Sequence, residues 1–160
     1  MSPIPRQLEI NLFHLMKIPK LFLQQTAGTK INQKVLLLGT IGRKTGKLRL
    51  TPLQYEYFRN RYYLGAMRGK KADWIKNIQV NSTVTLQFGT NSLLKGTAKI
   101  LDDPTIIYSF LRLRMARNPK MIPIILKLAG VRDIHNREEI LNYAKELCVV
   151  AVTIKKRIEL

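Results

Sequence analysis

A short basic loop between two apolar runs constrains the fold more than any other part of the chain. Val35 to Leu38 is apolar, the loop Gly42-Arg43-Lys44-Thr45-Gly46-Lys47 follows, and Leu48 to Phe58 is a second extended run. Two glycines bracket the loop, and their backbones can take turns that a Cβ would forbid. The pattern therefore predicts strands over residues 34–40 and 48–58, joined as a hairpin through a cationic loop.

The charge of this loop suggests an anion site. Four cations stand within seven positions: Arg43, Lys44, Lys47 and Arg49. Exposed backbone N–H groups beside fixed cations can bind a phosphate or a carboxylate. A solvated hairpin tip explains the loop alone equally well. It is not the phosphate-binding loop of nucleotide triphosphatases, because its glycines are one position too close and Leu48 stands where that motif needs a hydroxyl.

Composition narrows the class of partner. The chain has 160 residues and a net charge of +18, and no Asp or Glu occurs between Glu9 and Glu56. Such a field favours nucleic acid, a membrane surface or an anionic small molecule. Cys148 is the only cysteine, so no intrachain disulfide is expected, and its apolar surroundings predict a core residue. With only two histidines we expect no metal site. With no signal-peptide pattern and no apolar run of about 20 residues, we expect a cytoplasmic protein.

The remaining periodicities predict a single antiparallel α+β domain. Strands are expected over 62–67, 84–88, 93–101 and 148–154, with 155–160 as a polar tail. Helices are expected from Asp73 to about Asn81, from a cap at Asp103 to Asn118, over 121–131, and from a capping box at Asn136 and Glu139 to about residue 147. Consecutive hairpins with interspersed helices indicate a small barrel.

The N-terminal segment, residues 1–33, is expected to form a helix over 7–15 that packs on the barrel domain, residues 34–160. Its apolar positions recur at helical spacing, as on a packed helix. The alternative is a helix that contacts a membrane surface or a partner, so the protein would be membrane-associated.

A second basic loop, Arg68 to Lys71, leads into the short helix that carries Trp74, the only tryptophan. The side chain is most simply a core anchor. Its place directly after a basic loop also makes it a candidate wall for a planar ligand.

Three motifs together resemble a known family. They are G-R-K-T-G-K-x-R-x-T-P-L from Gly42, the string Gly65-Ala66-Met67-Arg68-Gly69, and A-D-W-I-K-N over 72–77. The chain resembles the deazaflavin-dependent nitroreductases, which are coenzyme F420-dependent oxidoreductases of the flavin-binding split-barrel superfamily. The resemblance covers roughly residues 34–100. It implies a six-stranded antiparallel split β-barrel with an N-terminal helix and peripheral helices, and a groove for F420, whose phosphodiester and glutamate tail is polyanionic.

The resemblance also implies cofactor-binding residues. Contacts to the ribityl–phosphate end would come from Arg43, Lys44 and Thr45. Residues under and beside the cofactor would be Arg49, Leu50, Thr51, Pro52, Leu53 and Gln54. The border where the third strand ends would be Gly65, Ala66, Met67 and Arg68. The far side would be closed by Asp73, Trp74, Ile75, Lys76 and Asn77.

The sequence departs from the nitroreductase pattern in three ways. That enzyme has serine and lysine where Met67 and Arg68 stand here, so a hydroxyl is lost while a cation is kept. The loop from Gly69 to Ala72 is shorter. The tyrosines that lie near the substrate in that group have no clear counterparts, and no catalytic side chain is identified.

The resemblance implies a reductase that passes hydride from reduced F420 to a small electron-poor acceptor such as a quinone, an activated alkene or a nitro compound. Three alternatives stay open. One is a split barrel that binds flavin mononucleotide (FMN), and another is a cofactor carrier without turnover. The third is a basic protein that binds nucleic acid or an anionic membrane without catalysis. Nucleic acid is less favoured, since strand packing largely explains the tyrosines that could stack on bases. Split barrels often pair, which allows a homodimer.

Overall fold

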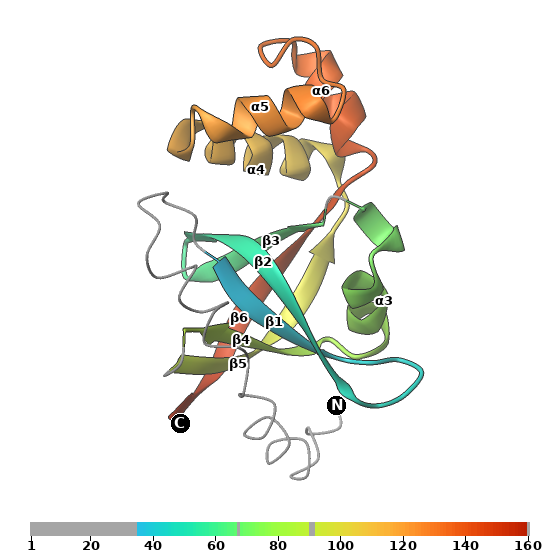
Figure 1. Cartoon of the computed structure of the whole chain (residues 1–160), viewed down its shortest axis with the longest axis vertical. Helices are drawn as coiled ribbons and strands as arrows, with labels where there is room; N and C mark the ends of the chain where they lie inside the picture. The colour runs from blue at the N-terminus through green and yellow to red at the C-terminus, as the bar shows by residue number, and fades with distance from the viewer. Residues whose placement is uncertain (1–34, 67, 90–91, 160) are drawn as a thin grey trace.

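The computed structural model describes residues 35–66, 68–89 and 92–159 (Figure 1). The expected helix over 7–15 lies outside the described residues, and its packing on the barrel stays a prediction. The strands are β1 (Val35–Ile41), β2 (Leu48–Phe58), β3 (Arg61–Ala66), β4 (Thr83–Phe88), β5 (Ser92–Leu101) and β6 (Cys148–Glu159). The helices are the 3₁₀ turn η1 (Gly69–Lys71), α3 (Asp73–Val80), α4 (Pro104–Arg117), α5 (Met121–Leu128) and α6 (Arg137–Ala144). The predicted α+β antiparallel barrel is confirmed.

The six strands close into a barrel in the order β1-β2-β3-β6-β5-β4, with every described pairing antiparallel. Alternate side chains point inward, as strand geometry requires. The buried cluster inside the barrel includes Leu38, Leu64, Leu86 and Val150. From α3, Ile75 belongs to the same cluster, so this helix is anchored to the barrel by its apolar face.

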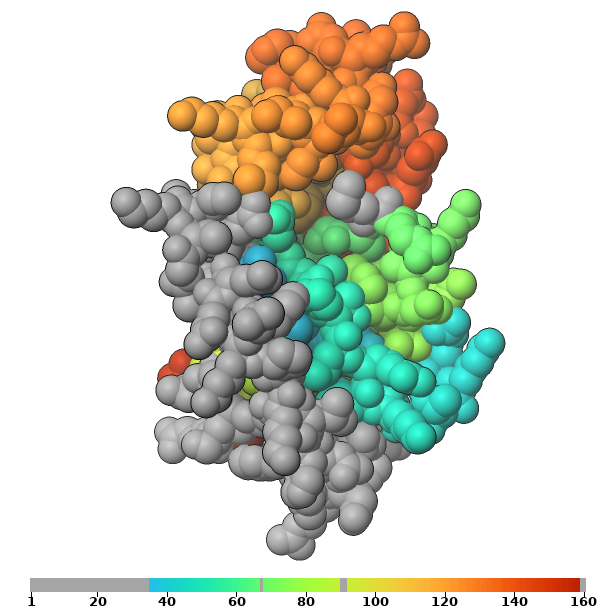
Figure 2. Space-filling model, in the orientation of Figure 1, coloured from blue at the N-terminus to red at the C-terminus, as the bar shows by residue number. Residues whose placement is uncertain are grey.

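The other three helices form a second layer above one end of the barrel (Figures 1 and 2). Their shared cluster includes Ile107 and Phe110 of α4, Leu126 of α5 and Ile140 of α6, together with Val149 of β6. The outward side chains of β3 and β6 therefore meet the helices, while the inward ones fill the barrel. Tyr63 packs on the helical cluster, whereas Tyr62 packs on the barrel cluster. These two neighbouring side chains therefore point to opposite faces of β3, as strand geometry requires.

Side chains close in sequence cap the N-termini of two helices. The Asp103 carboxylate accepts a hydrogen bond from the N–H of Thr105 at 2.8 Å, which caps α4. The Asn136 side chain accepts from the N–H groups of Glu138 and Glu139, which caps α6. The reciprocal half of the expected capping box is absent from the described contacts. The Glu139 carboxylate instead accepts from the backbone of Arg132, at 2.8 Å, and of the next residue.

The last strand is longer than predicted. Strand β6 continues to Glu159, opposite Ser92 at the start of β5, whereas the sequence pattern predicted a polar tail from Lys155. A register shift between Lys95 and Gly96 accommodates the extra residue. Backbone pairing with β5 stabilises this segment, and its three cations, Lys155, Lys156 and Arg157, are exposed to solvent, whereas Ile158 packs on the cluster of Leu48 and Leu93. Helix α6 is also shorter than predicted, since it ends at Ala144.

Among the described segments, no helix is both long enough and apolar enough to cross a membrane.

Candidate functional site

Two cavities adjoin each other, and we call the pair the groove. The first, of about 380 Å³, lies beside the basic loop. The second, of about 590 Å³, lies between the barrel and the helical layer. Both are lined by Thr51, Asp73 and Trp74, so they share a wall. We call the first the basic end of the groove and the second its covered end.

The loop at the basic end is closed by its own backbone. The N–H of Gly42 donates to the carbonyl of Lys47 at 2.8 Å, and the N–H of Gly46 donates to the carbonyl of Gly42 at 2.8 Å. Gly46 has a φ of 66°, in the left-handed region that favours glycine. The N–H of Lys47 donates to the Thr45 hydroxyl at 3.3 Å. The loop therefore holds one shape, and three of its N–H groups are used within it.

Arg43 braces the loop against α3. Its backbone N–H donates to Asn77 Oδ1 at 3.2 Å and its guanidinium to the same oxygen at 3.1 Å. The guanidinium also pairs with the Asp73 carboxylate at 3.1 Å, and this contact lowers the pKa of Asp73. The buried Asn77 amide in turn donates to the Thr40 hydroxyl at 3.1 Å, which ties in β1. Four N–H groups of the loop, those of Gly42, Arg43, Gly46 and Lys47, are therefore used within the protein and would not be free for an anion.

Lys44 and Arg49 are the cations best placed to bind an anion. Both are exposed and both line the basic end. Neither makes an ion pair or a side-chain hydrogen bond with any residue that the structure describes. Their charges are therefore available to a ligand, whereas Arg43 would have to share its guanidinium with Asp73.

The floor of the covered end is formed by β2 and β3. Thr51 to Gln54 and Gly65 to Ala66 line it. A Cβ at Gly65 would lie 3.3 Å from Cε1 of Phe110, so glycine at this position permits the close approach of α4. Trp74 is buried in the barrel cluster and lines both cavities. The expected core anchor is confirmed, and its contact with a planar ligand stays a prediction.

The roof of the covered end comes from segments that lie outside the predicted site. Helices α4 and α5 contribute Phe110, Leu111, Arg114, Ile122, Ile125 and Leu126, and Tyr143 and Leu147 complete it. The roof is therefore mostly apolar. One signal was available, because Arg114 shares a helical face with Phe110 and Leu111, and a cation on an apolar face needs a partner.

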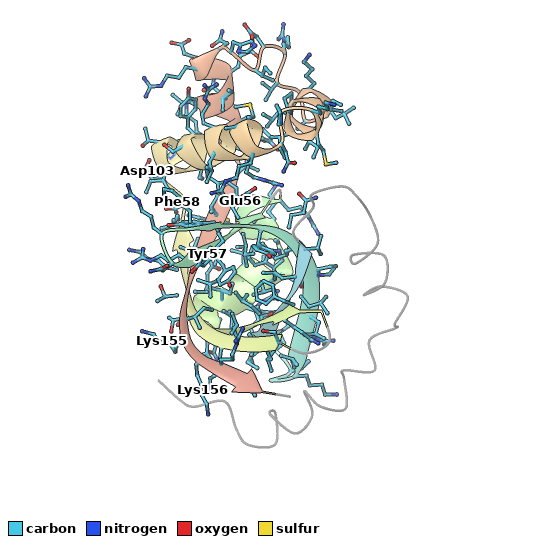
Figure 3. The ribbon with its side chains drawn as sticks, turned by 90° about the vertical axis from the view of Figure 1, so that its left-hand side faces the viewer. Glu56, Tyr57, Phe58, Asp103, Lys155 and Lys156 are labelled. Atoms are coloured by element: carbon cyan, nitrogen blue, oxygen red, sulfur yellow. The ribbon has the colours of Figure 1, made fainter. Side chains whose placement is uncertain are left out.

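That partner is Glu56, which is 5 % exposed beneath α4 (Figure 3). Its carboxylate lies 2.7 Å from Nη1 of Arg117 and 3.7 Å from Nε of Arg114. The Arg114 guanidinium also donates to the side-chain oxygen of Gln54. Burial lowers the pKa of Arg114, against the opposing effect of Glu56. This network fixes α4 over β2 and places a cation at the edge of the covered end.

Two other titratable groups line the covered end. Burial raises the pKa of the Tyr143 hydroxyl and also that of the Cys148 thiol. Both groups therefore keep their protons at neutral pH. Cys148 is fully buried, which confirms the prediction of a core cysteine.

The structure brings most of the predicted cofactor-binding residues to the groove. The residues that line it are Arg43, Lys44, Thr45, Arg49, Thr51, Pro52, Leu53, Gln54, Gly65, Ala66, Arg68, Asp73, Trp74 and Asn77. Leu50 instead packs on the small cluster around Leu48 and Leu93, and Ile75 is buried in the barrel. Lys76 lines neither cavity, and Met67 lies outside the described residues.

Comparison with known proteins identifies a family and a fold. The family model described as F420H(2)-dependent quinone reductase matches residues 20–120. A conserved hypothetical protein from Mycobacterium tuberculosis superposes with a TM-score of 0.59 at 12% identity, over 88% of this chain and 82% of that one. A haem storage protein from Vibrio cholerae gives 0.56 at 14% identity, over 88% and 90%. An F420 reductase gives 0.53 at 12% identity, over 79% and 90%. At these identities the structural likeness shows the split-barrel fold.

Proposed function

The chain belongs to the F420H(2)-dependent quinone reductase family, and we propose that it is an oxidoreductase using the reduced deazaflavin coenzyme F420 as a hydride donor. One observation carries the proposal beyond family membership. The groove joins a cationic end to a covered end whose lining is mostly apolar. A ligand with an anionic tail and a flat ring system matches that division.

The residues of the groove suit this cofactor. Its tail carries a phosphodiester and glutamates, and Lys44 and Arg49 offer exposed cations without partners in the described chain. Arg68 adds a third cation at the border of the covered end. In the covered end, the floor has a short side chain at Pro52 and none at Gly65, and Trp74 provides a flat wall suited to the ring system of the coenzyme.

The chain's own residues would orient the reactants and exclude water, while the bound coenzyme supplies the hydride. The apolar roof of α4 and α5 covers the place where a ring would lie over β2. Tyr143 lines the same cavity, and its hydroxyl carries a proton at neutral pH, as an ordinary tyrosine does. It is the side chain that we propose to supply the proton that must accompany a hydride.

The acceptor that we propose is a small electron-poor molecule: a quinone, an activated alkene or a nitro compound. The roof offers aliphatic and aromatic contacts from Leu111, Ile125 and Phe110. Arg114 at the cavity edge can donate to an acceptor oxygen on which negative charge develops, as preorganised donors do in other enzymes. These features favour an acceptor with an apolar body and an oxygen substituent.

The proposal is tested by anaerobic oxidation of reduced F420, followed by absorbance, with a panel of the three acceptor classes. Replacement of Lys44 or Arg49 by alanine should raise KM for the coenzyme by about 10-fold each, the lower end of the range for a charge-assisted contact because both side chains are exposed. Lys156→Ala is the matched control, since this exposed lysine lies at the far end of the barrel from the helices (Figure 3).

The possible outcomes separate the alternatives. Turnover that depends on Lys44 and Arg49 but not on Lys156 supports the proposal. Tight binding of F420 without turnover for any acceptor would indicate a cofactor carrier. Turnover with reduced FMN alone would replace the cofactor while keeping the fold.

A further inference from the structure

Helix α5 exposes an apolar face to solvent. Its sequence is MIPIILKL, and Ile124 and Leu128 are 58% and 84% exposed. These two positions are four residues apart and therefore lie on one side of the helix. Lys127 is exposed on the same side. An isolated exposed aliphatic side chain is ordinary, but two adjacent ones on an eight-residue helix form a patch.

The opposite side of α5 belongs to the groove. Ile122 and Leu126 are almost completely buried, and both line the covered end together with Ile125. A single helix, about 10 Å across with its side chains, therefore separates the covered end from the exposed patch. Figure 1 shows α5 on the outside of the helical layer, at the end of the molecule away from β1 and β4.

The chain segment that contains this helix carries cations and no carboxylate. No Asp or Glu occurs from residue 104 to residue 132, whereas the same stretch holds six cations. Lys120, immediately before α5, and Arg132, shortly after it, are both exposed. The buried carboxylate of Glu56 is already paired with two arginines from α4. The patch is thus aliphatic at its centre with the exposed Lys120 and Lys127 beside it, whereas Arg132 has Asp133 and Glu139 as neighbours.

We propose that the exposed face of α5 docks on an anionic lipid bilayer. Ile124 and Leu128 would enter the headgroup region, and Lys120 and Lys127 would contact lipid phosphates, with the long lysine stem of Lys127 lying along the apolar surface. An apolar helical face with basic flanks is the arrangement by which helices lie in a membrane interface. Each basic side chain near an anionic surface adds to the attraction.

The same features argue against other occupants. Two aliphatic side chains on a short helix fall well below the roughly 800 Å² that each partner buries in a stable protein interface. A second copy would bring its own lysines and its net charge of +18 against this face. Nucleic acid would meet no exposed aromatic ring on α5 on which bases could stack.

Docking through α5 would place the covered end next to the bilayer. An acceptor dissolved in lipid would then reach the cavity by passing beside one helix. This consequence rests on the proposed function, whereas the docking itself does not.

The test places a probe on the helix of the full chain. Leu128→Cys is labelled with a polarity-sensitive fluorophore, and Val80→Cys, at a position that is 71% exposed on α3, is the matched control. Cys148 is fully buried, so the introduced thiol is the one that reacts, and labelling of the parent protein checks this. Vesicles of phosphatidylcholine mixed with phosphatidylglycerol should shift the emission of the probe at 128 to the blue, and brominated lipids should quench it. The probe at 80 should not respond.

A second measurement keeps the proposal independent of the label. Ile124→Asp and Leu128→Asp should each weaken partition into the anionic vesicles by roughly tenfold, as expected from loss of one inserted aliphatic side chain. Val80→Asp should not. Binding of F420 in buffer without vesicles should be unchanged in all three variants, so a failure of docking is distinguishable from a failure of the proposed function.

Three results would overturn the proposal. The protein could show no affinity for anionic vesicles. It could bind them with the probe at 128 still in water, which would assign the contact to another surface. The emission of the probe at 128 could shift to the blue without lipid, by an amount that grows with protein concentration. That result would show the patch to be a contact between copies of the chain.

Discussion

Replacing Glu56 by glutamine tests whether buried charge holds α4 over the barrel. The substitution keeps the shape of the side chain and removes its charge. Glu56 is 5% exposed, and the two arginines that it pairs with are 19% (Arg114) and 36% (Arg117) exposed in their side chains. Removing one partner of a buried ion pair costs about 3–5 kcal/mol, because the remaining charge is left uncompensated. Since Arg117 can be partly rehydrated by solvent, we expect the lower end, about 3 kcal/mol.

The effect is large enough to measure by thermal or urea unfolding. In a domain of this size, 1 kcal/mol changes the melting temperature by roughly 2–4 °C, so Glu56→Gln should lower it by about 6–12 °C. High salt should neither reproduce nor remove the loss, because buried pairs are poorly screened. The double variant with Arg117→Gln should lose less than the sum of the two single changes, since the groups are in contact.

The matched control is Asp102→Asn. It breaks the pair of Asp102 with Lys70, whose side chains are both more than half exposed, and exposed pairs contribute little. The melting temperature of this variant should stay close to that of the parent. If Glu56→Gln changed stability no more than Asp102→Asn does, the network with Arg114 and Arg117 would not be what anchors α4.

Three further predictions concern the floor of the groove, a helix cap and pH. Gly65→Leu should place a side chain against Phe110 and fill the covered end, so it should weaken the binding of F420 in a fluorescence titration. Gly65→Ala should have a smaller effect, because it adds one methyl group, 3.3 Å from Cε1 of Phe110. Asn136→Ala should lose about 1 kcal/mol in urea unfolding, since it removes the cap of α6, and an unchanged midpoint would show the cap to be dispensable. The contact with Arg43 lowers the pKa of the Asp73 carboxyl in the folded state below its value of about 3.9 in the unfolded state. The ionised carboxylate therefore stabilises the fold at every pH above about 3.9, and this stabilisation is lost as the pH falls through the folded-state pKa. Unfolding midpoints of the parent and of Asp73→Asn should therefore converge as the pH is lowered from about 7 to about 3, and a constant difference would contradict this reasoning.

Strand positions could be predicted because they depend on local patterns. The alternation of Val84, Leu86 and Phe88 with polar residues marks β4, and the turn at Asn60 marks the hairpin of β2 and β3. The structure gives Arg59 and Asn60 φ values of 47° and 60°, so the turn is left-handed at both positions. Such signals lie within a few residues of each other, and tertiary contacts did not override them.

The far end of β6 could not be predicted because its stability comes from a partner distant in sequence. Lys156 and Arg157 have no strand pattern of their own, and they are paired with Lys95 and Leu94 because β5 begins early enough to meet them. The roof of the groove could not be predicted from the sequence for the same reason. Leu111 and Ile125 follow an ordinary core pattern, and only their packing above β2 makes them part of a cavity.

The role of Arg43 could not be predicted for a different reason. The sequence identifies a cation in a tight loop but not the direction of its guanidinium. That direction is set by Asp73 and Asn77, which are on α3 and about 30 residues away in sequence. A loop that looks like an anion site from its composition is thus partly satisfied from within the protein, and Lys44 and Arg49 remain for a ligand.

The most direct test of the central claim is a fluorescence titration of the full chain with oxidised F420, with FMN in parallel. We predict saturable binding of F420, weakened about 10-fold by Lys44→Ala and by Arg49→Ala, and unchanged by Lys156→Ala, which removes the same charge outside the groove. Equal weakening by all three changes would show that net charge rather than the groove attracts the ligand. The absence of F420 binding would contradict the assignment of the groove as a deazaflavin site.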